Sequence, residues 1–239
     1  MGIRIHNVGV VIPAGGRGLR MLARPTGGGR TLPKQFLLLN GKPILQHSIQ
    51  AFDSLKSVNE IVIVVPEDQV RRAEELVKKA RFKKVSHVVI GGSERQHSVR
   101  NGLLSFDKEP EIILVHDAVR PFVIAEVINK VVEESEKYGA AVVGVRVKDT
   151  VKLGEEGFYK KTLDRNKLWA VQTPQGFRFE ILKRAHIAAQ RTAFLGTDEA
   201  SLVERLRIPV KIVEGDYRNI KITTDDDLKL AEMLVDSKP

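Results

Sequence analysis

The chain has 239 residues, of which 42% are apolar and 29% are charged, a balance typical of a globular protein that can bury a substantial core. No apolar run approaches the roughly 18 residues that a membrane-spanning helix requires, and the lack of cysteine excludes disulfides and thiolate metal sites. The formal net charge of +9 favours an anionic partner, but the basic residues are spread along the chain and aromatic residues make up only 5%, so nucleic-acid binding is poorly supported.

The beginning of the chain lacks the pattern of a secretory signal peptide. The length suits one large α/β domain with an excursion. We therefore expect a cytoplasmic protein, not bound to a membrane, with a single domain over residues 1–239.

A glycine-rich loop follows the first apolar run. Residues 8–12 are apolar and mostly β-branched, which predicts a buried parallel strand. The loop begins with Pro13, Ala14, Gly15 and Gly16. Glycine lets the backbone approach a ligand and turn its amide hydrogens toward an anion, and Arg20 and Lys34 add positive charge. These features predict a phosphate site, with a solvated surface turn as the alternative.

Two common phosphate-binding motifs do not match this stretch. A Walker A loop needs Ser or Thr after its Gly-Lys pair, but Gly41-Lys42 is followed by Pro43. A dinucleotide fingerprint needs a third glycine where Met21 stands. P-loop chemistry is therefore disfavoured, and NAD binding is a weak alternative.

Strands and helices alternate along the next part of the chain. After a short strand at 37–39 and a turn at Asn40-Gly41, a helix is expected from Pro43. We expect strands at residues 61–65, 85–90, 112–115 and 140–145, and helices at 67–79 and 124–138. Gly91 and Gly92 mark a second junction between a strand and a helix. The alternation predicts an α/β fold with a mostly parallel, doubly wound sheet.

Asp117 directly follows the expected strand at 112–115. An aspartate at the carboxyl end of a buried parallel strand can hold Mg²⁺, because ligands collect outside those ends in open α/β sheets. The alternative is a helix N-cap, for which aspartate is also favoured. The nearby Arg120 makes a site the better interpretation.

The pattern changes at residues 146–175, which alternate, turn at residues 154–157 and alternate again. This predicts a hairpin arm that projects from the sheet. A two-stranded ribbon is marginally stable alone in water, so the arm needs a surface to pack on, and a partner subunit is one answer.

The end of the chain predicts two helices, at 179–191 and 198–206, a strand at 210–213 and a last helix from Thr224. Three aspartates, residues 225–227, fall in the first turn of that last helix. Negative charge there is favourable to the helix dipole. Helix capping therefore explains this triplet better than a metal site does.

Eight segments, in this order, resemble one enzyme family. They are PAGGRGLRM, PKQF, GGSERQHSV, HDAVRP, VKDTVK, LDRNKLWAVQTPQGF, TDEASLVE and NIKITTDDDL. Together they resemble the 2-C-methyl-D-erythritol 4-phosphate cytidylyltransferases of the non-mevalonate isoprenoid pathway, over essentially the full chain. The resemblance implies a nucleotidyltransferase (Rossmann-like) fold and a homodimer with an extended arm. It also implies an Mg²⁺-dependent reaction of CTP with a sugar-alcohol phosphate, giving a CDP-alcohol and pyrophosphate.

The resemblance also implies roles for particular residues. The catalytic cations around the CTP triphosphate would be Arg20, Lys34 and Lys221, and Asp117 would be the Mg²⁺ ligand. The cytosine and ribose would be enclosed by Pro13, Ala14, Gly15, Gly16, Gly92 and Ser98. The acceptor phosphate would contact Thr150 and Arg165 on the arm, with Arg120 as a further contributor.

Three other functions are alternatives. A ribitol 5-phosphate cytidylyltransferase would share the fold, the CTP site and the metal, but would differ in the acceptor alcohol. A noncatalytic nucleotide-binding regulator would be favoured if Arg20, Lys34 or Asp117 were missing, and all three are present. A nucleic-acid binder is the third.

Overall fold

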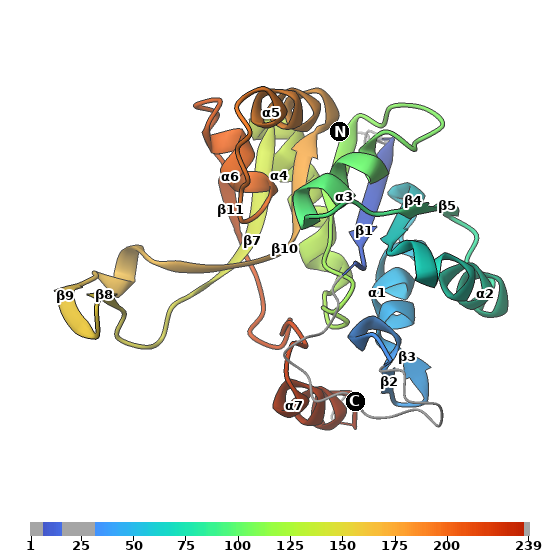
Figure 1. Ribbon diagram of the computed structural model, residues 1–239, viewed down its shortest axis with the longest axis horizontal. Helices are drawn as coiled ribbons and strands as arrows, with labels where there is room; N and C mark the ends of the chain where they lie inside the picture. Colours follow the sequence, from blue (N-terminus) through green and yellow to red (C-terminus); the bar gives the residue numbers. More distant parts are fainter. Residues whose placement is uncertain (1–6, 16–31, 237–239) are drawn as a thin grey trace.

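A twisted sheet of seven strands forms the centre of the computed structural model, which describes residues 7–15 and 32–236 (Figure 1). The strand order is β11-β7-β10-β6-β1-β4-β5. These strands are β1 (Val8–Pro13), β4 (Val58–Val65), β5 (Val85–Ile90), β6 (Ile112–Val115), β7 (Ala140–Arg146), β10 (Trp169–Arg178) and β11 (Lys211–Glu214). All neighbours pair in parallel except β10, which runs antiparallel to both β6 and β7. The prediction of a mostly parallel α/β sheet is confirmed.

Helices cover both faces of the sheet because its strands carry apolar side chains on both faces. One core cluster joins β1 and β4 to α1 (Ile44–Asp53), α2 (Val70–Ala80) and α4 (Ala125–Tyr138). The opposite cluster joins the sheet to α3 (Arg95–Leu103), α5 (Phe179–Arg191) and α6 (Glu199–Glu204). Strands buried on both faces read as continuous apolar runs, which is the pattern seen in residues 61–65 and 112–115.

The last helix packs away from the sheet. Helix α7 (Asp225–Asp236) contributes to a third apolar cluster with Leu39, Ile44 and Val119. Leu39 belongs to a small hairpin of β2 (Leu38–Leu39) and β3 (Lys42–Pro43), which follows the 3-10 turn η1 (Lys34–Phe36). This packing brings the segment before α7 close to the carboxyl ends of the central strands.

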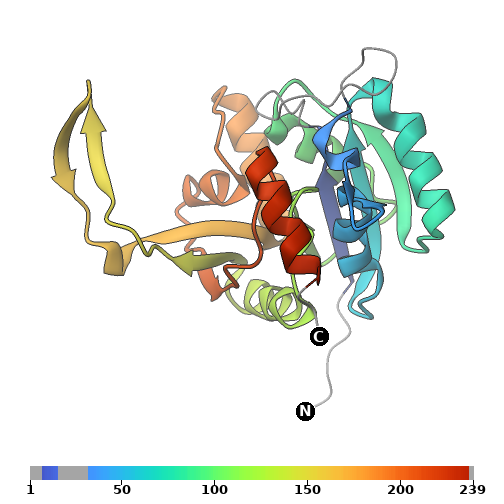
Figure 2. The same cartoon turned by 90° about the horizontal axis from the view of Figure 1, so that it is seen from below.

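The arm projects far from the body in two perpendicular views (Figures 1 and 2). It carries the hairpin of β8 (Lys152–Glu155) and β9 (Phe158–Thr162). Its turn has Glu156 and Gly157 with φ of 50° and 83°, the left-handed pair that suits a two-residue hairpin. The predicted hairpin and turn are confirmed. The arm is shorter than the predicted 146–175, because residues 169–175 already belong to β10 and pair with β7 in the sheet.

Element boundaries differ from the predictions by a few residues. Strand β4 begins at Val58, three residues before the expected strand, and a 3-10 turn η2 (Glu67–Gln69) precedes α2. Over residues 7–15 and 32–236, no helix combines the length and apolar character needed to cross a membrane.

Candidate active site

A cleft of about 190 Å³ lies at the carboxyl ends of β1 and β6 and at the start of α3. Among the residues that line it are many of those predicted from the sequence: Pro13, Ala14, Gly15, Lys34, Gly92, Ser98, Asp117 and Lys221. These residues come from segments far apart along the chain. The structure therefore brings the predicted nucleotide, cation and metal positions into one place, at the sheet edge where ligands of open α/β folds bind.

Three of the predicted residues that the structure describes do not line this cleft, and two more cannot be placed. Gly16 and Arg20 lie outside the described residues. Thr150 and Arg165 are exposed at the base of the arm, where Arg165 donates a hydrogen bond to the carbonyl of Lys148 (2.9 Å). Arg120 lies behind the cleft, beside Asp117, with its side chain 11% exposed.

The walls of the cleft are held by short polar contacts. The Ala14 N–H donates to the carbonyl of Val64 (2.7 Å), and the buried Gln35 side chain donates to the carbonyl of Ala14 (2.5 Å). At the α3 junction, Ser98 Oγ accepts from the Gly92 N–H (3.1 Å) and donates to the carbonyl of Glu94 (3.1 Å).

Glycine is required at position 92 because a Cβ there would lie 2.4 Å from Cβ of His97. Only a residue without a side chain lets the strand end and helix α3 approach this closely. The missing side chain thus holds the end of β5 close against the start of α3.

Asp117 is buried among three cations. Its Oδ2 lies 2.8 Å from Nζ of Lys221 and 3.7 Å from Nε of Arg120, and its Oδ1 lies 3.2 Å from Nε of Arg95. Burial opposes ionisation of this carboxyl group, but the charges of Arg95, Lys221 and Arg120 outweigh burial and hold the pKa of Asp117 well below its usual range. Asp117 is therefore a carboxylate at any physiological pH.

Arg95 and Glu199 were missed by the sequence reasoning. Glu199 is 1% exposed, and both its oxygens accept from Nη1 of Arg95, at 2.6 and 2.9 Å. Burial lowers the pKa of Arg95, but the charges of Glu199 and Asp117 outweigh it and raise that pKa. The two residues are 104 positions apart, so no local pattern could pair them. Arg95 does follow the Gly91-Gly92 junction, and that position was its one available signal.

The backbone of Asp117 is fixed by a chain of hydrogen bonds. Its N–H donates to Thr173 Oγ1 (3.1 Å), which lies 3.0 Å from His116 Nδ1. His116 Nε2 lies 3.0 Å from the carbonyl of Arg120, so Nε2 carries the proton and Nδ1 accepts from Thr173. Burial lowers the pKa of His116 to about 4, which keeps this arrangement neutral.

Lys221 reaches the cleft from a tightly held segment. The side-chain amide of Asn219 donates to the carbonyl of Thr173 (2.9 Å), and the Ile222 N–H donates to the carbonyl of Val119 (2.9 Å). With both neighbours anchored, the Lys221 side chain, 40% exposed, extends between Asp117 and the solvent.

The donor set fits a magnesium ion that is shared with a phosphorylated ligand. Among the described residues, the carboxylates that line the cleft are Asp117 and the exposed Glu94. Magnesium in nucleotide enzymes is held by one or two carboxylates together with substrate phosphates and water. Asp117 provides such a ligand, with surrounding cations that suit phosphate oxygens.

The fold and the cleft together define a class of protein. Three features together are typical of a nucleotidyltransferase. They are a doubly wound sheet, glycine-marked loops at its carboxyl edge, and several cations around one carboxylate at that edge. The model of the family described as 2-C-methyl-D-erythritol 4-phosphate cytidylyltransferase (IspD) matches residues 8–237. The chain belongs to this family, whose reaction joins CTP and 2-C-methyl-D-erythritol 4-phosphate into a CDP-alcohol with release of pyrophosphate.

Relatives and solved structures agree with this assignment. The 2-C-methyl-D-erythritol 4-phosphate cytidylyltransferase of Geobacillus kaustophilus is 46% identical over 97% of this chain and 98% of its own length. The 4-diphosphocytidyl-2C-methyl-D-erythritol synthase structure from Anaerococcus prevotii matches with a TM-score of 0.84 at 27% identity, over 97% of this chain and 96% of that one. The Thermus thermophilus cytidylyltransferase structure matches with a TM-score of 0.76 at 33% identity, over 96% and 99%.

Proposed function

We propose that this cleft performs the family's reaction with Mg²⁺ and that Lys34, Lys221 and Arg20 supply its catalytic charge. In that reaction a phosphate oxygen of the acceptor forms a bond to the α-phosphorus of CTP, and the bond from that phosphorus to the bridging oxygen of pyrophosphate breaks. The observation that supports this best is the convergence of Lys34, Lys221 and the buried Asp117 on one cleft.

Cations are needed because one anion attacks another and negative charge builds on the leaving pyrophosphate. Preorganised charges aimed at such developing charge commonly contribute a few kcal/mol each. The acceptor phosphate is already ionised, so the step requires no general base. The Lys221 side chain can move from Asp117 to the nucleotide phosphates because it is 40% exposed. Its backbone stays in place during this movement because Asn219 and Ile222 are anchored by hydrogen bonds.

Asp117 is the residue that would hold Mg²⁺. Bound there, the ion would supply positive charge that offsets part of the charge of the nucleotide phosphates. Arg95 and Arg120 keep the Asp117 carboxylate ionised and oriented whether or not the metal is present.

The nucleoside is proposed to lie between the glycine-marked loops. Residues 13–16 would face it from one side, and Gly92 and Ser98 from the other. A small pocket between these loops would admit a pyrimidine and exclude a purine.

The acceptor is proposed to bind against the arm of a partner subunit in a homodimer. Thr150 and Arg165 are exposed on the arm and do not line the cleft of their own chain. Arg120, which donates to the carbonyl of Asn219 (2.7 Å) and faces Asp117, would complete the acceptor side of the cleft.

The reaction and its acceptor can be tested together by measuring pyrophosphate release from CTP. We expect release with 2-C-methyl-D-erythritol 4-phosphate and Mg²⁺, and much less with ribitol 5-phosphate or without a divalent cation. Faster release with ribitol 5-phosphate would identify ribitol 5-phosphate, instead of 2-C-methyl-D-erythritol 4-phosphate, as the acceptor. CTP binding with no release under any condition would favour a noncatalytic regulator.

The role of Lys34 gives the first prediction. Lys34→Ala should lower kcat by a factor of about 100 or more and change the Kd for CTP much less, because its charge matters most as pyrophosphate departs. The matched control is Lys42→Ala, which removes an exposed lysine from β3. A higher KM for CTP with kcat unchanged would show that Lys34 binds CTP but does not stabilise the transition state.

A further inference from the structure

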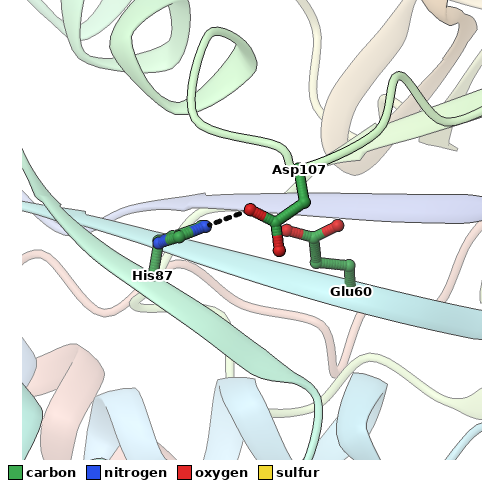
Figure 3. A group of neighbouring side chains, drawn as sticks. All are labelled: Glu60, His87 and Asp107. Carbon is green, nitrogen blue, oxygen red and sulfur yellow. Dashed lines mark hydrogen bonds and ion pairs between the residues drawn. The ribbon is translucent and has the colours of Figure 1, made fainter.

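Three potential metal ligands meet at the end of the sheet opposite to the cleft. Glu60 lies near the start of β4, His87 lies near the start of β5, and Asp107 lies in the loop between α3 and β6. One ligand atom from each residue lies within 4.8 Å of the other two, and Figure 3 shows the three side chains pointing toward one another.

The two carboxylates of this cluster lack a basic partner. Within the described part of the chain, no Lys or Arg nitrogen lies within ion-pair distance of Glu60 or Asp107. Each carboxylate contacts a polar side chain: Asp107 Oδ1 lies 3.2 Å from His87 Nε2, and Glu60 Oε1 accepts from Ser86 Oγ (2.6 Å). The chain has 39 Lys and Arg residues, yet none of those that the structure describes pairs with either carboxylate. A bound cation would relieve their mutual repulsion.

The distances are close to those of a metal centre. Bonds of about 2.1 Å to a tetrahedral ion place neighbouring ligand atoms ~3.4 Å apart. His87 Nε2 and Asp107 Oδ1 are already at 3.2 Å, and a carboxylate oxygen of Glu60 lies within 4.8 Å of a ligand atom of each of these residues, so small side-chain rotations would bring all three onto one ion. The Glu60 side chain is half-buried, whereas the side chains of His87 and Asp107 are 38% and 76% exposed. The three side chains can therefore rotate toward one ion without movement of the backbone.

We propose that Glu60, His87 and Asp107 form a binding site for a divalent transition-metal ion of the zinc class, with water as the remaining ligand. One imidazole and two carboxylates suit Zn²⁺, Co²⁺ or Ni²⁺, whereas Mg²⁺ prefers an all-oxygen octahedral site. The ion would join β4, β5 and the loop before β6. It would therefore stabilise the folded protein without taking part in the reaction.

The test is a Zn²⁺ titration of untagged, metal-stripped full-length protein in the presence of excess Mg²⁺, which keeps the Asp117 site occupied by the harder ion. The wild-type protein should bind about one equivalent more Zn²⁺ than either Glu60→Gln or His87→Gln, or bind it at least about 10-fold more tightly. Co²⁺ should give the wild-type protein visible absorption that both variants lack. Zn²⁺ should raise the melting temperature of the wild type more than that of the variants.

The matched control is Glu67→Gln, which removes an exposed carboxylate from η2. It should bind Zn²⁺ and Co²⁺ as the wild type does. Melting temperatures without metal should agree among all four proteins, which shows that the variants fold. Equal Zn²⁺ stoichiometry and affinity in the wild type and in both site variants would overturn the proposal, as would a wild type that binds no Zn²⁺.

Discussion

Arg95 divides its guanidinium between two carboxylates, one inside the cleft and one behind it. Glu199 holds Nη1 at 2.6 Å, while Nε lies 3.2 Å from Asp117. Because the arginine fork is planar and rigid, fixing one end orients the other. Glu199 thus acts on the cleft through Arg95, and we regard it as a positioning residue.

The second prediction concerns this pair. Glu199→Gln keeps the shape of the side chain but removes the charge that holds Arg95. Without that charge, Arg95 would shift and would no longer hold the Asp117 carboxylate in its present orientation. Because small misplacements in an active site are costly, kcat should fall roughly 10- to 100-fold, while the Kd for CTP changes less. Steady-state kinetics with CTP binding measured separately checks this. Glu204→Gln, which alters an exposed carboxylate at the end of the same helix, should match the wild type, and equal kinetics in both variants would refute the role of Glu199.

The third prediction concerns His186, which is 3% exposed and whose Nε2 has no hydrogen-bond partner among the described residues. Burial, and then the charges of Arg100, Arg95 and His97, lower its pKa to about 4. An unfolded histidine titrates at about 6.5. Below that pH the unfolded chain takes up a proton that the folded chain does not, so this stability is complete above about pH 6.5 and is lost as pH falls toward 4.

His186→Leu should remove this pH dependence. Between pH 7.5 and 5 the wild type should lose on the order of 2 kcal/mol more unfolding free energy than the variant. Urea midpoints at the two pH values measure the difference. His87→Gln alters a histidine that does not contribute to this shift and should show the same decrease as the wild type. A variant with the full wild-type decrease would show that His186 is not its source.

At the scale of elements, the start of α7 connects stability to the cleft. Asp227 Oδ2 accepts from the N–H groups of Thr223 and Thr224, both at 2.8 Å, and the Asp227 N–H donates to Thr224 Oγ1 (3.2 Å). This reciprocal cap confirms that the acidic triplet belongs to a helix start. The helix begins two residues after Thr223, and Lys221 lies two residues before Thr223, so the cap limits the movement of the segment that carries Lys221.

The fourth prediction is that Asp227→Ala lowers the unfolding free energy by about 1–2 kcal/mol, the usual cost of losing a helix cap. Asp226→Ala is the control, because among the described residues the ion-pair partner of Asp226 is the exposed Lys229 of the same helix (3.0 Å), and its loss should cost less than about 0.5 kcal/mol. Urea denaturation measures both. Equal losses in the two variants would contradict a specific cap at Asp227.

At the scale of the whole molecule, the arm is the element that packs least against the rest of its own chain. Every residue of β8 and β9 is exposed, including Phe158 at 75% and Tyr159 at 80%. An isolated hairpin of this kind is marginally stable in water. Large exposed aromatic side chains on such an element mark an interaction surface, which agrees with the proposed dimer.

The fifth prediction tests whether a partner's arm completes each cleft. Lys34→Ala and Arg165→Ala proteins are denatured and refolded together, so that about half of the dimers are mixed. In a mixed dimer, the cleft of the Arg165→Ala subunit keeps its own Lys34 and receives an intact Arg165. Activity should recover to roughly a quarter of that of the same amount of wild type. With mixed dimers confirmed, activity no higher than that of the separate mutants would rule out the shared site.

Much of the fold and the cleft could be predicted from local patterns. The apolar runs at residues 61–65 and 112–115 predicted buried strands, and Asp117 was expected at a ligand site because it follows the carboxyl end of one of them. The turns at Asn40-Gly41 and Glu156-Gly157 followed from residues that tolerate positive φ. Each of these inferences depends on the side-chain period or on backbone geometry within a few residues.

Local patterns therefore predicted most of the strands and helices in order, apart from β10, and the resemblance predicted the family and most residues of the cleft. Only the tertiary structure decided that β10 runs antiparallel between β6 and β7, so that Thr173 reaches the backbone of Asp117. It also decided that Glu199 holds Arg95 and that Glu60, His87 and Asp107 meet. The physical reason is that these contacts join segments tens of residues apart, and their geometry is set by how strands and helices pack, which no local period encodes.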